Sequence, residues 1–291
     1  MDDEGTGDII KNYGHITGAF TGVLLGGLSD GGDLLNYGSI RGGSFGVQEL
    51  SNNTGGTIVN YGNISSAQTG VEVWTNTDLT TSIVNKASRV ISGHTHAIFV
   101  NTQGGISLTN YGTINGNIDC NSDSGDAIHN HGKIHGIVEL YNRSDFFDGR
   151  GGTSGAIFCA GNDHVIAGNG NLSIHAGAGE STLTGGSGHD SFFFDVALDP
   201  FAQPTIITNF VHGTDKIVLS EAIFGGLGPH GKLGAAHFHV GDPVNSVAQI
   251  DYNPSSGELD YRAHGNAGPA IDFATLINVP SVTASDFHLI A

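Results

Sequence analysis

The chain has 291 residues, and glycine accounts for 47 of them, about 16%, more than twice the usual ~7%. Acidic residues outnumber basic ones by 28 to 10, which gives a formal net charge of -18. This balance excludes a nucleic-acid-binding protein, which needs a basic surface, and no stretch approaches the ~18 apolar residues of a membrane span. Glycine costs ~1 kcal/mol in a helix interior, and 38% apolar residues argue against disorder, so a β-rich acidic protein remains.

The first 140 residues repeat a short phrase that begins with an Asn-Tyr-Gly triplet or a variant of it. The Asn residues of the copies are Asn12, Asn36, Asn60, Asn85, Asn110 and Asn130, at intervals of 24, 24, 25, 25 and 20. A second phrase lies between them and begins at Gly22, Gly46, Gly70, Ala97 and Gly136. The runs are of β type, and a repeat this short cannot bury its own apolar face. We therefore expect the copies to stack as a parallel β-helix.

Stacking assigns a role to each residue type of the repeat. Equivalent residues of successive coils lie ~4.8 Å apart, so inward Ile, Val and Leu form columns. Equivalent Asn side chains form an amide ladder at the bend, where Asn also tolerates a left-handed backbone. We expect Tyr13 and its equivalents to stack on the outside, and a platform for carbohydrate is the functional alternative.

A period of nine residues replaces this pattern near residue 140. Six consecutive frames begin at residues 140, 149, 158, 167, 176 and 185 without an insertion, and the eighth position is apolar in every frame. The last frame, residues 185–193, matches the nonapeptide G-G-x-G-x-D-x-U-x in full.

Residues 140–193 resemble the calcium-binding β-roll of the RTX (repeats-in-toxin, hemolysin-type) proteins. Residues 205–217, 250–261 and 284–291 are similar to segments that follow such rolls, although the family typically has Asp at the position of Asn209. The resemblance implies calcium-dependent folding outside the cell. It also implies export by a type I system that reads an uncleaved C-terminal signal. The N-terminal repeats resemble, more loosely, those of secreted β-helix passengers and adhesins.

Calcium takes six to eight oxygen ligands, which glycine-rich turns supply as carbonyls and the sixth position of the frame supplies as a carboxylate. One coil of such a roll uses two frames, so the sixth positions of one side are Asp145, Asp163 and Ser181, and those of the other are Ser154, Leu172 and Asp190. We predict one calcium site between Asp145 and Asp163, and poorer candidates at Asp163/Ser181 and at Asp190. The predicted metal-site residues are Asp145, Asp163, Asp190, Gly161, Gly186 and Gly188. The alternative is that Asp163 and Asp190 only cap turns.

Histidines form two His-x-His pairs, His94 with His96 and His129 with His131, whose side chains share one face of a strand. A zinc site needs three or four converging ligands. No third ligand appears at motif spacing, so we expect surface histidines of a stacked ladder, with an adventitious zinc or nickel site as the alternative.

The enzyme alternative is a polysaccharide lyase, because lyases also use β-helices. A lyase needs a cation to neutralise a uronate and a base to take its proton, and Arg89 with His94 and His96 is the candidate cluster. For glycoside hydrolysis, Glu49 and Glu72 are the candidate acids, one coil apart. No other catalytic motif appears.

Several local features carry smaller predictions. Cys120 and Cys159 are too few for a disulfide framework, and we expect both to be small buried apolar residues. Asp199-Pro200 and Asp242-Pro243 form turns, with self-cleavage as the alternative. The first residues lack the basic and apolar regions of a secretory leader. That leaves a longer natural chain, a cytoplasmic protein or export without a cleaved leader. Their acidic character would guard against self-association through an open solenoid end.

These observations predict an all-β chain in three parts: a parallel β-helix (1–140), an RTX β-roll (141–195) and a C-terminal β cap with a type I secretion signal (196–291). The predicted function is that of a secreted or surface-associated, calcium-binding structural or adhesive protein, and the alternative is a glycan-active enzyme. The predicted cofactor is Ca²⁺. The expected partners are calcium and a cell-surface or extracellular polysaccharide, with self-association as a further option; no nucleic acid and no membrane span are expected.

Overall fold

The computed structural model describes residues 2–3, 9–26, 32–50, 55–76, 78–141, 143–241, 247 and 249–291. Over these residues the chain forms strands, turns and three short 3₁₀ segments but no α-helix, and the strands build a parallel β-solenoid of about 8 turns. The predicted all-β solenoid is therefore confirmed. The chain divides into two compact units, Met1–Ile157 and Phe158–Ala291. No helix in the described part of the chain has the length and apolar character needed to span a membrane.

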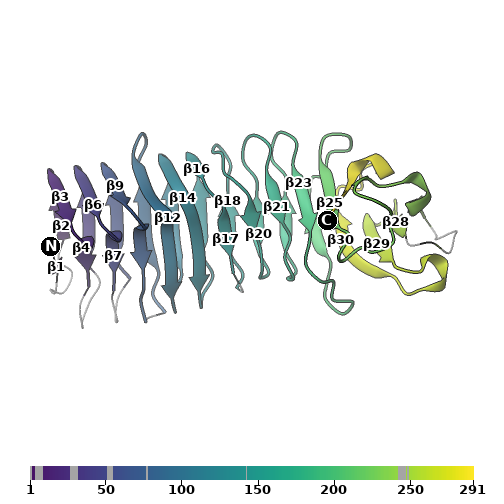
Figure 1. The fold of residues 1–291 in the computed structure, drawn as a ribbon, viewed down its shortest axis with the longest axis horizontal. Coiled ribbons are helices and arrows are strands. Elements are labelled where there is room, and N and C mark those ends of the chain that lie inside the picture. Colours follow the sequence, from purple (N-terminus) through teal and green to yellow (C-terminus); the bar gives the residue numbers. More distant parts are fainter. Residues whose placement is uncertain are drawn as a thin grey trace. The chain divides into compact units, whose positions relative to one another are not determined.

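The first unit winds through three series of parallel strands (Figure 1). The first series is β2 (Ile9–Asn12), β5 (Asp33–Asn36), β8 (Thr57–Asn60), β11 (Thr81–Asn85), β13 (Ile106–Asn110), β15 (Ala127–Asn130) and β18 (Phe146–Asp148). The second is β3 (His15–Gly18), β6 (Ser39–Gly42), β9 (Asn63–Ser66), the beginnings of β12 (Val90–Thr102) and β14 (Thr113–Ser122), and β16 (Lys133–His135). The third is β4 (Thr21–Leu25), β7 (Phe45–Glu49), β10 (Thr69–Val73), the ends of β12 and β14, and β17 (Val138–Leu140). The short strand β1 (Asp2–Asp3) pairs with β4, and β19 (Ile157–Phe158) lies at the division between the units.

The core of the first unit consists of three columns of branched apolar side chains. One column runs through Ile10, Leu34, Ile58, Ile83, Leu108, Ile128 and Phe147, which are all buried register partners. The other two are an isoleucine column from Ile16 to Ile134 and a Val/Ile column from Val23 to Val138. Since successive side chains of a strand point to opposite faces, the alternating pattern of the sequence fixes which residues enter these columns.

The predicted amide ladder runs through the first unit. The Nδ2 of each Asn donates to the Oδ1 of the next, at 2.8 Å between Asn12 and Asn36 and at 2.8 to 2.9 Å over the four following steps. Each side chain also bonds backbone groups of the bend; Asn60 accepts from Gly62 N and donates to Val90 O. The ladder satisfies buried polar groups that would otherwise destabilise the bend.

The second unit has two series of parallel strands. The first is β20 (His164–Ile166), β22 (Thr182–Thr184), β24 (Thr205–Ile207) and β30 (Ile271–Leu276). The second is β21 (Ser173–His175), β23 (Ser191–Phe194), β25 (Lys216–Ser220) and β31 (Phe287–Ile290). His164 pairs with Thr182 and Ser173 with Ser191, so one coil takes up 18 residues, or two nonapeptides.

The last coil of the second unit contains an insertion. Its strands are β26 (Gly231–Lys232), β27 (Phe238–Val240), β28 (Gln249–Tyr252) and β29 (Glu258–Arg262), and its 3₁₀ segments are Ala235–His237 and Gly265–Ala267. The strands β28, β29 and β30 pair antiparallel, and β26 pairs antiparallel with β31. This mixed pairing ends the purely parallel winding.

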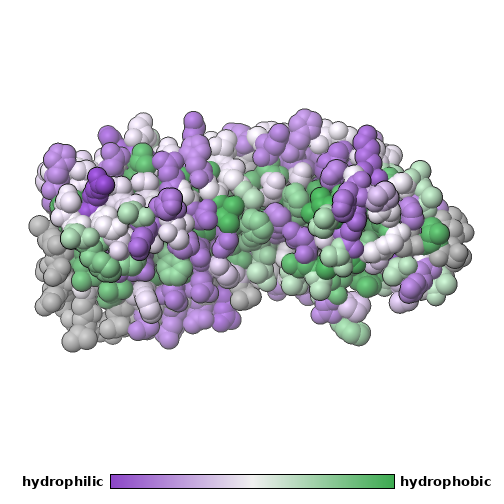
Figure 2. All heavy atoms as spheres, in the orientation of Figure 1, coloured by the Kyte–Doolittle hydropathy of each residue, from purple (hydrophilic) through white to green (hydrophobic). Residues whose placement is uncertain are grey.

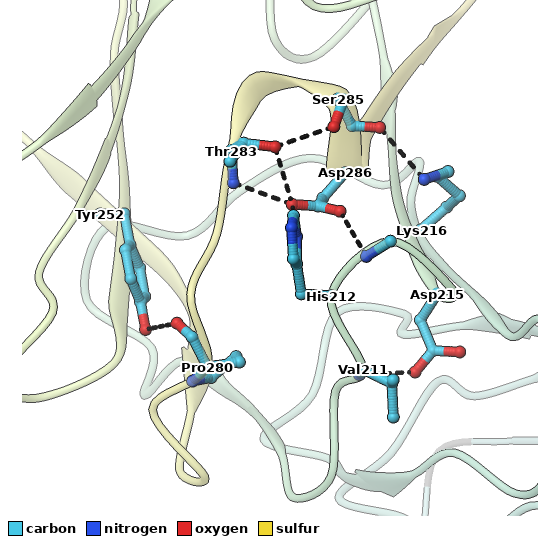
Figure 3. A network of polar contacts seen from close by, with 10 residues as sticks. Val211, His212, Asp215, Lys216, Tyr252, Pro280, Thr283, Ser285 and Asp286 are labelled. Atoms are coloured by element: carbon cyan, nitrogen blue, oxygen red, sulfur yellow. Dashed lines mark hydrogen bonds and ion pairs between the residues drawn. The ribbon is translucent and has the colours of Figure 1, made fainter.

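Asp286 joins the C-terminal segment to an earlier loop of the second unit (Figure 3). It lies in the 3₁₀ segment Ala284–Asp286 and is fully buried. Its carboxylate accepts the N–H groups of Gly213 (3.0 Å) and Thr283 (2.8 Å) and contacts His212 Nδ1 at 2.7 Å. Burial alone would raise the pKa of Asp286, but these partners lower it below its ordinary value. The segment predicted to carry the secretion signal is thus an integral strand of the fold.

The cysteines and the Asp199-Pro200 turn lie in the described part of the chain. Cys120 and Cys159 are both buried, as expected of small apolar residues. Asp199 Oδ1 accepts the N–H of Phe201 at 2.9 Å, which is a turn, while Asp242-Pro243 lies outside the described residues. On the face drawn in Figure 2, hydrophilic residues gather along the upper and lower edges and separate the apolar residues into small groups.

Candidate functional site

The predicted calcium ligands Asp145 and Asp163 lie in different units, Asp145 in the first and Asp163 in the second. Both are buried, with exposed fractions of 3% and 1%. Asp145 Oδ1 accepts the N–H of Asp126 at 2.7 Å. Asp163 Oδ2 accepts the N–H of Gly161 at 3.3 Å, and the carbonyl of Gly161 accepts the hydroxyl of Ser181 at 3.2 Å. Asp145 and Asp163 are therefore both buried and hydrogen-bonded to backbone N–H groups, and their role as calcium ligands stays a prediction.

Asp190 has a different environment, because backbone donors engage both of its carboxylate oxygens. Oδ1 accepts Leu172 N at 2.9 Å and Oδ2 accepts Gly186 N at 2.7 Å, and the residue is 1% exposed. Asp190 N in turn donates to Asp215 Oδ1 at 3.0 Å, so the pattern repeats in the next coil. Asp190 thus caps backbone N–H groups of the loop, and its role as a calcium ligand stays a prediction.

The glycines of these loops are required by the backbone. Gly188 has a φ of +131°, and a Cβ there would lie 2.6 Å from the carbonyl oxygen of Gly170. At Gly186 a Cβ would lie 1.9 Å from Gly168 O. Asn209 pairs with the Gly185 backbone through both its amide groups, at 2.6 Å each. An ionised Asp at residue 209 could not donate to Gly185 O, so the amide of Asn209 satisfies a backbone group that a carboxylate would leave without a donor.

The residues present fit calcium unequally. Carboxylates and glycine carbonyls are the hard oxygen ligands that calcium prefers, and Asp145 and Asp163 stand in such loops. Both oxygens of Asp190 already accept backbone N–H groups, so a calcium ion there would share the carboxylate with these donors. No group of three or more His, Cys, Asp or Glu side chains in the described ranges is arranged to hold a metal ion.

The members of the predicted lyase cluster differ in their surroundings. His96 Nε2 lies 3.6 Å from Asp119 Oδ2, and the His96 ring packs at 5.1 Å from Phe99. Arg89 and His94 are exposed, and neither is seen in contact with His96 within the described part of the chain. The other His-x-His pair is also divided, because His131 stacks on Tyr111 while His129 packs edge-on against Phe146.

The two candidate acids Glu49 and Glu72 point to opposite faces of their strands. Glu72 pairs in register with Gln48, while Glu49 pairs with Val73, so the carboxylates cannot act on one substrate. Glu49 is fully buried; its Oε1 accepts Gly56 N at 2.6 Å and its Oε2 has no hydrogen-bond partner. Burial raises the pKa of Glu49 to about 7.

A second acidic pair, which sequence reasoning did not find, lies on the outer face of the third strand series. Asp119 and Glu139 are register neighbours, and the Tyr141 hydroxyl lies 2.8 Å from Glu139 Oε2 and 3.4 Å from Asp119 Oδ2. Burial, followed by the charge of Glu139, raises the pKa of Asp119. Burial and the two carboxylates also raise the pKa of Tyr141, so the phenol keeps its proton and no phenolate is present to act as a base.

The outer aromatic stack is confirmed, but it does not form a carbohydrate platform. The rings of Tyr13 and Tyr37 are 4.9 Å apart and nearly parallel, and those of Tyr37 and Tyr61 are 4.8 Å apart. Lys86 Nζ lies 5.5 Å from the centroid of the Tyr61 ring. Because the ring faces contact one another, they are not presented side by side to a sugar.

A polar groove lies on the first unit where the third series of strands ends. It has a volume of about 310 Å³, and we call it the Trp74 groove after its largest side chain. Its lining residues are Trp74, Thr75, Asn76, Asn101, Thr102, Gln103, Asn121 and Asp123. Sequence reasoning missed it. The available signal was Trp74 itself, the single tryptophan of the chain, at the end of an alternating strand.

No family model matches the chain, and no curated protein matches it significantly.

Proposed function

We propose that the chain is a secreted or surface-associated β-solenoid with a structural or adhesive role, and that calcium stabilises its glycine-rich coils. The observation that carries the structural part is the amide ladder from Asn12 to Asn130, which joins six consecutive coils by side-chain hydrogen bonds. Together with the three apolar columns, the ladder fills the interior of the first unit with contacts between successive coils.

The outer surface gives the enzyme alternative less support. A lyase needs a positioned cation and a base, and Arg89 is an exposed residue with no ion pair or hydrogen bond to His96 among the described residues. The acidic pair of Asp119 and Glu139 has His96 and Tyr141 beside it, but no lysine or arginine bonds it in the described residues. Such a surface favours binding over turnover.

The calcium part of the proposal is supported by the nonapeptide frames and by the oxygen donors of their loops. Asp145 and Asp163 would be the carboxylate ligands, with loop carbonyls completing the set. Since unfolded chain lacks these loops, calcium would stabilise the folded state by mass action. Export of an unfolded chain with a net charge of -18, followed by folding where calcium is abundant, is consistent with this role.

Thermal melts in calcium, in magnesium and in chelator test the proposal. Calcium at about millimolar, extracellular-type concentration should raise the melting temperature clearly, and magnesium should not. Asp163→Ala should remove most of the shift. Asp199→Ala, which removes the same charge from a turn outside the frames, should leave it intact. Identical melts in calcium and chelator would contradict the calcium part.

Assays on polysaccharides test the structural part against the enzyme alternative. We expect no turnover of acidic polysaccharides with or without calcium. Arg89→Ala should change the free energy of unfolding by no more than ~0.5 kcal/mol, as surface substitutions usually do, whereas His96→Ala also removes contacts with Asp119 and Phe99 and should cost about 1 kcal/mol. Turnover that either substitution abolishes in a folded protein would replace the structural role with a lyase.

A further inference from the structure

The Trp74 groove is built by three successive coils in register. Val73 pairs with Val100, Val100 pairs with Cys120, and Asn101 pairs with Asn121. The residues that follow these paired positions, Trp74, Asn101 and Asn121, therefore form a row across the coils, with neighbours ~4.8 Å apart. Paired strands hold this row rigidly, which is the arrangement that a precise binding site needs.

The amides of this row differ from those of the inner ladder in having no partner. Every ladder Asn, such as Asn60 or Asn110, has side-chain hydrogen bonds. Among the described residues, the side-chain amides of Asn101, Gln103 and Asn121 make none. Each amide has both donors and an acceptor, so the row offers paired hydrogen-bonding groups to a ligand that also carries both.

Trp74 supplies the apolar part of the groove. The side chain is 53% exposed, and its ring stacks on no other ring in the described residues. Tryptophan combines a large flat face with an N–H donor and costs little conformational entropy on binding. A flat aromatic face beside free amides suits a sugar ring, which has an apolar C–H face and a rim of hydroxyls.

The charge of the groove determines which class of sugar can bind there. Asp123 lies in the groove, and its ion pair with Arg143, at 3.5 Å between exposed groups, is weak. No lysine or arginine is among the lining residues, and the chain as a whole carries a net charge of -18. A uronic acid or sulfated sugar would be repelled, whereas an uncharged one would not.

We propose that the Trp74 groove binds an uncharged polysaccharide, with one sugar ring against Trp74 and hydroxyls of the chain on Asn101, Gln103 and Asn121. This inference rests on the proposed adhesive role and names its ligand class. A volume of about 310 Å³ lies at the small end of ligand pockets, so the groove holds a short stretch of the polysaccharide.

The single tryptophan makes the test direct, because tryptophan fluorescence reports on the groove alone. Neutral hexasaccharides built from glucose, xylose, mannose or N-acetylglucosamine are titrated into the full chain, beside hexagalacturonate. At least one neutral probe should shift the emission of Trp74, and hexagalacturonate should bind at least tenfold more weakly. Asp123→Asn should reduce the difference in affinity between the neutral probe and hexagalacturonate.

Calorimetry on folded variants supplies the second readout. Trp74→Ala should weaken binding of the neutral probe about tenfold, and Asn101→Ala and Asn121→Ala several-fold each. Phe201→Ala, which removes a 93% exposed aromatic from the second unit, is the matched control and should bind normally.

Three results would overturn the inference: no neutral probe gives a fluorescence shift or heat, hexagalacturonate binds as tightly, or Trp74→Ala binds as well as the natural chain. In the last case the glycan binds elsewhere, so the adhesive role would stand while the groove assignment fails.

Discussion

Asparagine side chains at the inner bend of the first unit differ in burial and hydrogen bonding from those on its outer face. Asn60 is fully buried, and every polar atom of its amide has a partner in the ladder. Asn121 is exposed in the Trp74 groove and makes no side-chain hydrogen bond among the described residues. The inner amide contributes to stability, whereas the outer one is available to a ligand.

The first prediction concerns Asn60. Asn60→Ala should lower the free energy of unfolding by roughly 1–3 kcal/mol, because it leaves the buried amides of Asn36 and Asn85 each lacking one partner. Asn63→Ala, an exposed asparagine three residues later, is the control and should stay within ~0.5 kcal/mol. Urea denaturation measures both, and equal effects would show that the ladder adds nothing specific.

The second prediction is a pH dependence at Glu49. Burial raises the pKa of its folded-state carboxyl from 4.5 to about 7, so the folded chain binds more protons there than the unfolded chain between these values. Stability from this group is therefore present below about pH 4.5 and is lost as the pH rises to about 7. Glu49→Gln removes the titration.

The measurement is the difference in unfolding free energy between the natural chain and Glu49→Gln across this range. The natural chain should lose up to a few kcal/mol relative to the variant from about pH 5 to about pH 8. Other acids with raised pKa values, such as Asp126 and Asp272, cancel in the difference. A flat difference would mean that Glu49 is not buried.

Sequence could predict the ladder but not the groove, for a physical reason. The positions of Asn12 to Asn130 follow from a local repeat, because each coil reproduces the last. The alternation that places Val47 inward also places Glu49 inward, so its burial could have been predicted from the strand period. The Trp74 groove depends on how coils of 24, 25 and 20 residues end beside one another, and no local pattern encodes that.

At the scale of elements, the loops of the second unit are held by carboxylates that accept backbone N–H groups. Asp190 bonds Leu172 N and Gly186 N, and Asp215 bonds Asp190 N and Val211 N. The nonapeptide pattern predicts that Asp190 lies in a loop, but this loop position suits either a calcium ligand or a cap. Only the directions of neighbouring N–H groups distinguish these roles.

The third prediction separates the two roles at Asp190. Asp190→Asn keeps one side-chain oxygen, so one of the two backbone donors loses its acceptor, and stability should fall by about 1–3 kcal/mol. If Asp190 is a cap, the loss should be equal in calcium and in chelator. A loss seen in calcium alone would make Asp190 a ligand. Asp163→Ala, measured alongside, provides the calcium-sensitive comparison.

The fourth prediction concerns the turn at Gly188. Gly188→Ala should destabilise the second unit by about 2 kcal/mol or more, because its φ of +131° and the 2.6 Å approach to Gly170 O leave no room for a Cβ. Gly225→Ala is the control in the same unit, since a Cβ there would meet no atom closer than 3.9 Å. Thermal melts of the two variants should therefore diverge.

At the scale of the whole molecule, like charges dominate. The net charge of -18 is spread over 28 acidic and 10 basic residues, so self-repulsion opposes the compact state. This term can be predicted from composition alone, and it requires no knowledge of the fold.

The fifth prediction follows from that repulsion. In chelator, raising sodium chloride from about 0.1 M to about 1 M shortens the screening length from about 10 Å to about 3 Å and should raise the melting temperature by a few degrees. An uncharged osmolyte at matched osmolality is the control for solvent exclusion. Melts that do not respond to salt would indicate that the acidic residues are already neutralised by local partners.

Because successive coils of the first unit pair in the same register, the unit can lose or gain one whole coil at a time. Ile9–Asn12 pair with Asp33–Asn36, which pair in the same alignment with Thr57–Asn60. Removing residues 33–56 would therefore bring β2 beside β8 with every column and the amide ladder still matched. Loss or gain of one coil alters neither the cross-section nor the chemistry of what remains. Duplication of a short stretch of sequence is thus a direct route to a longer or shorter protein of the same kind.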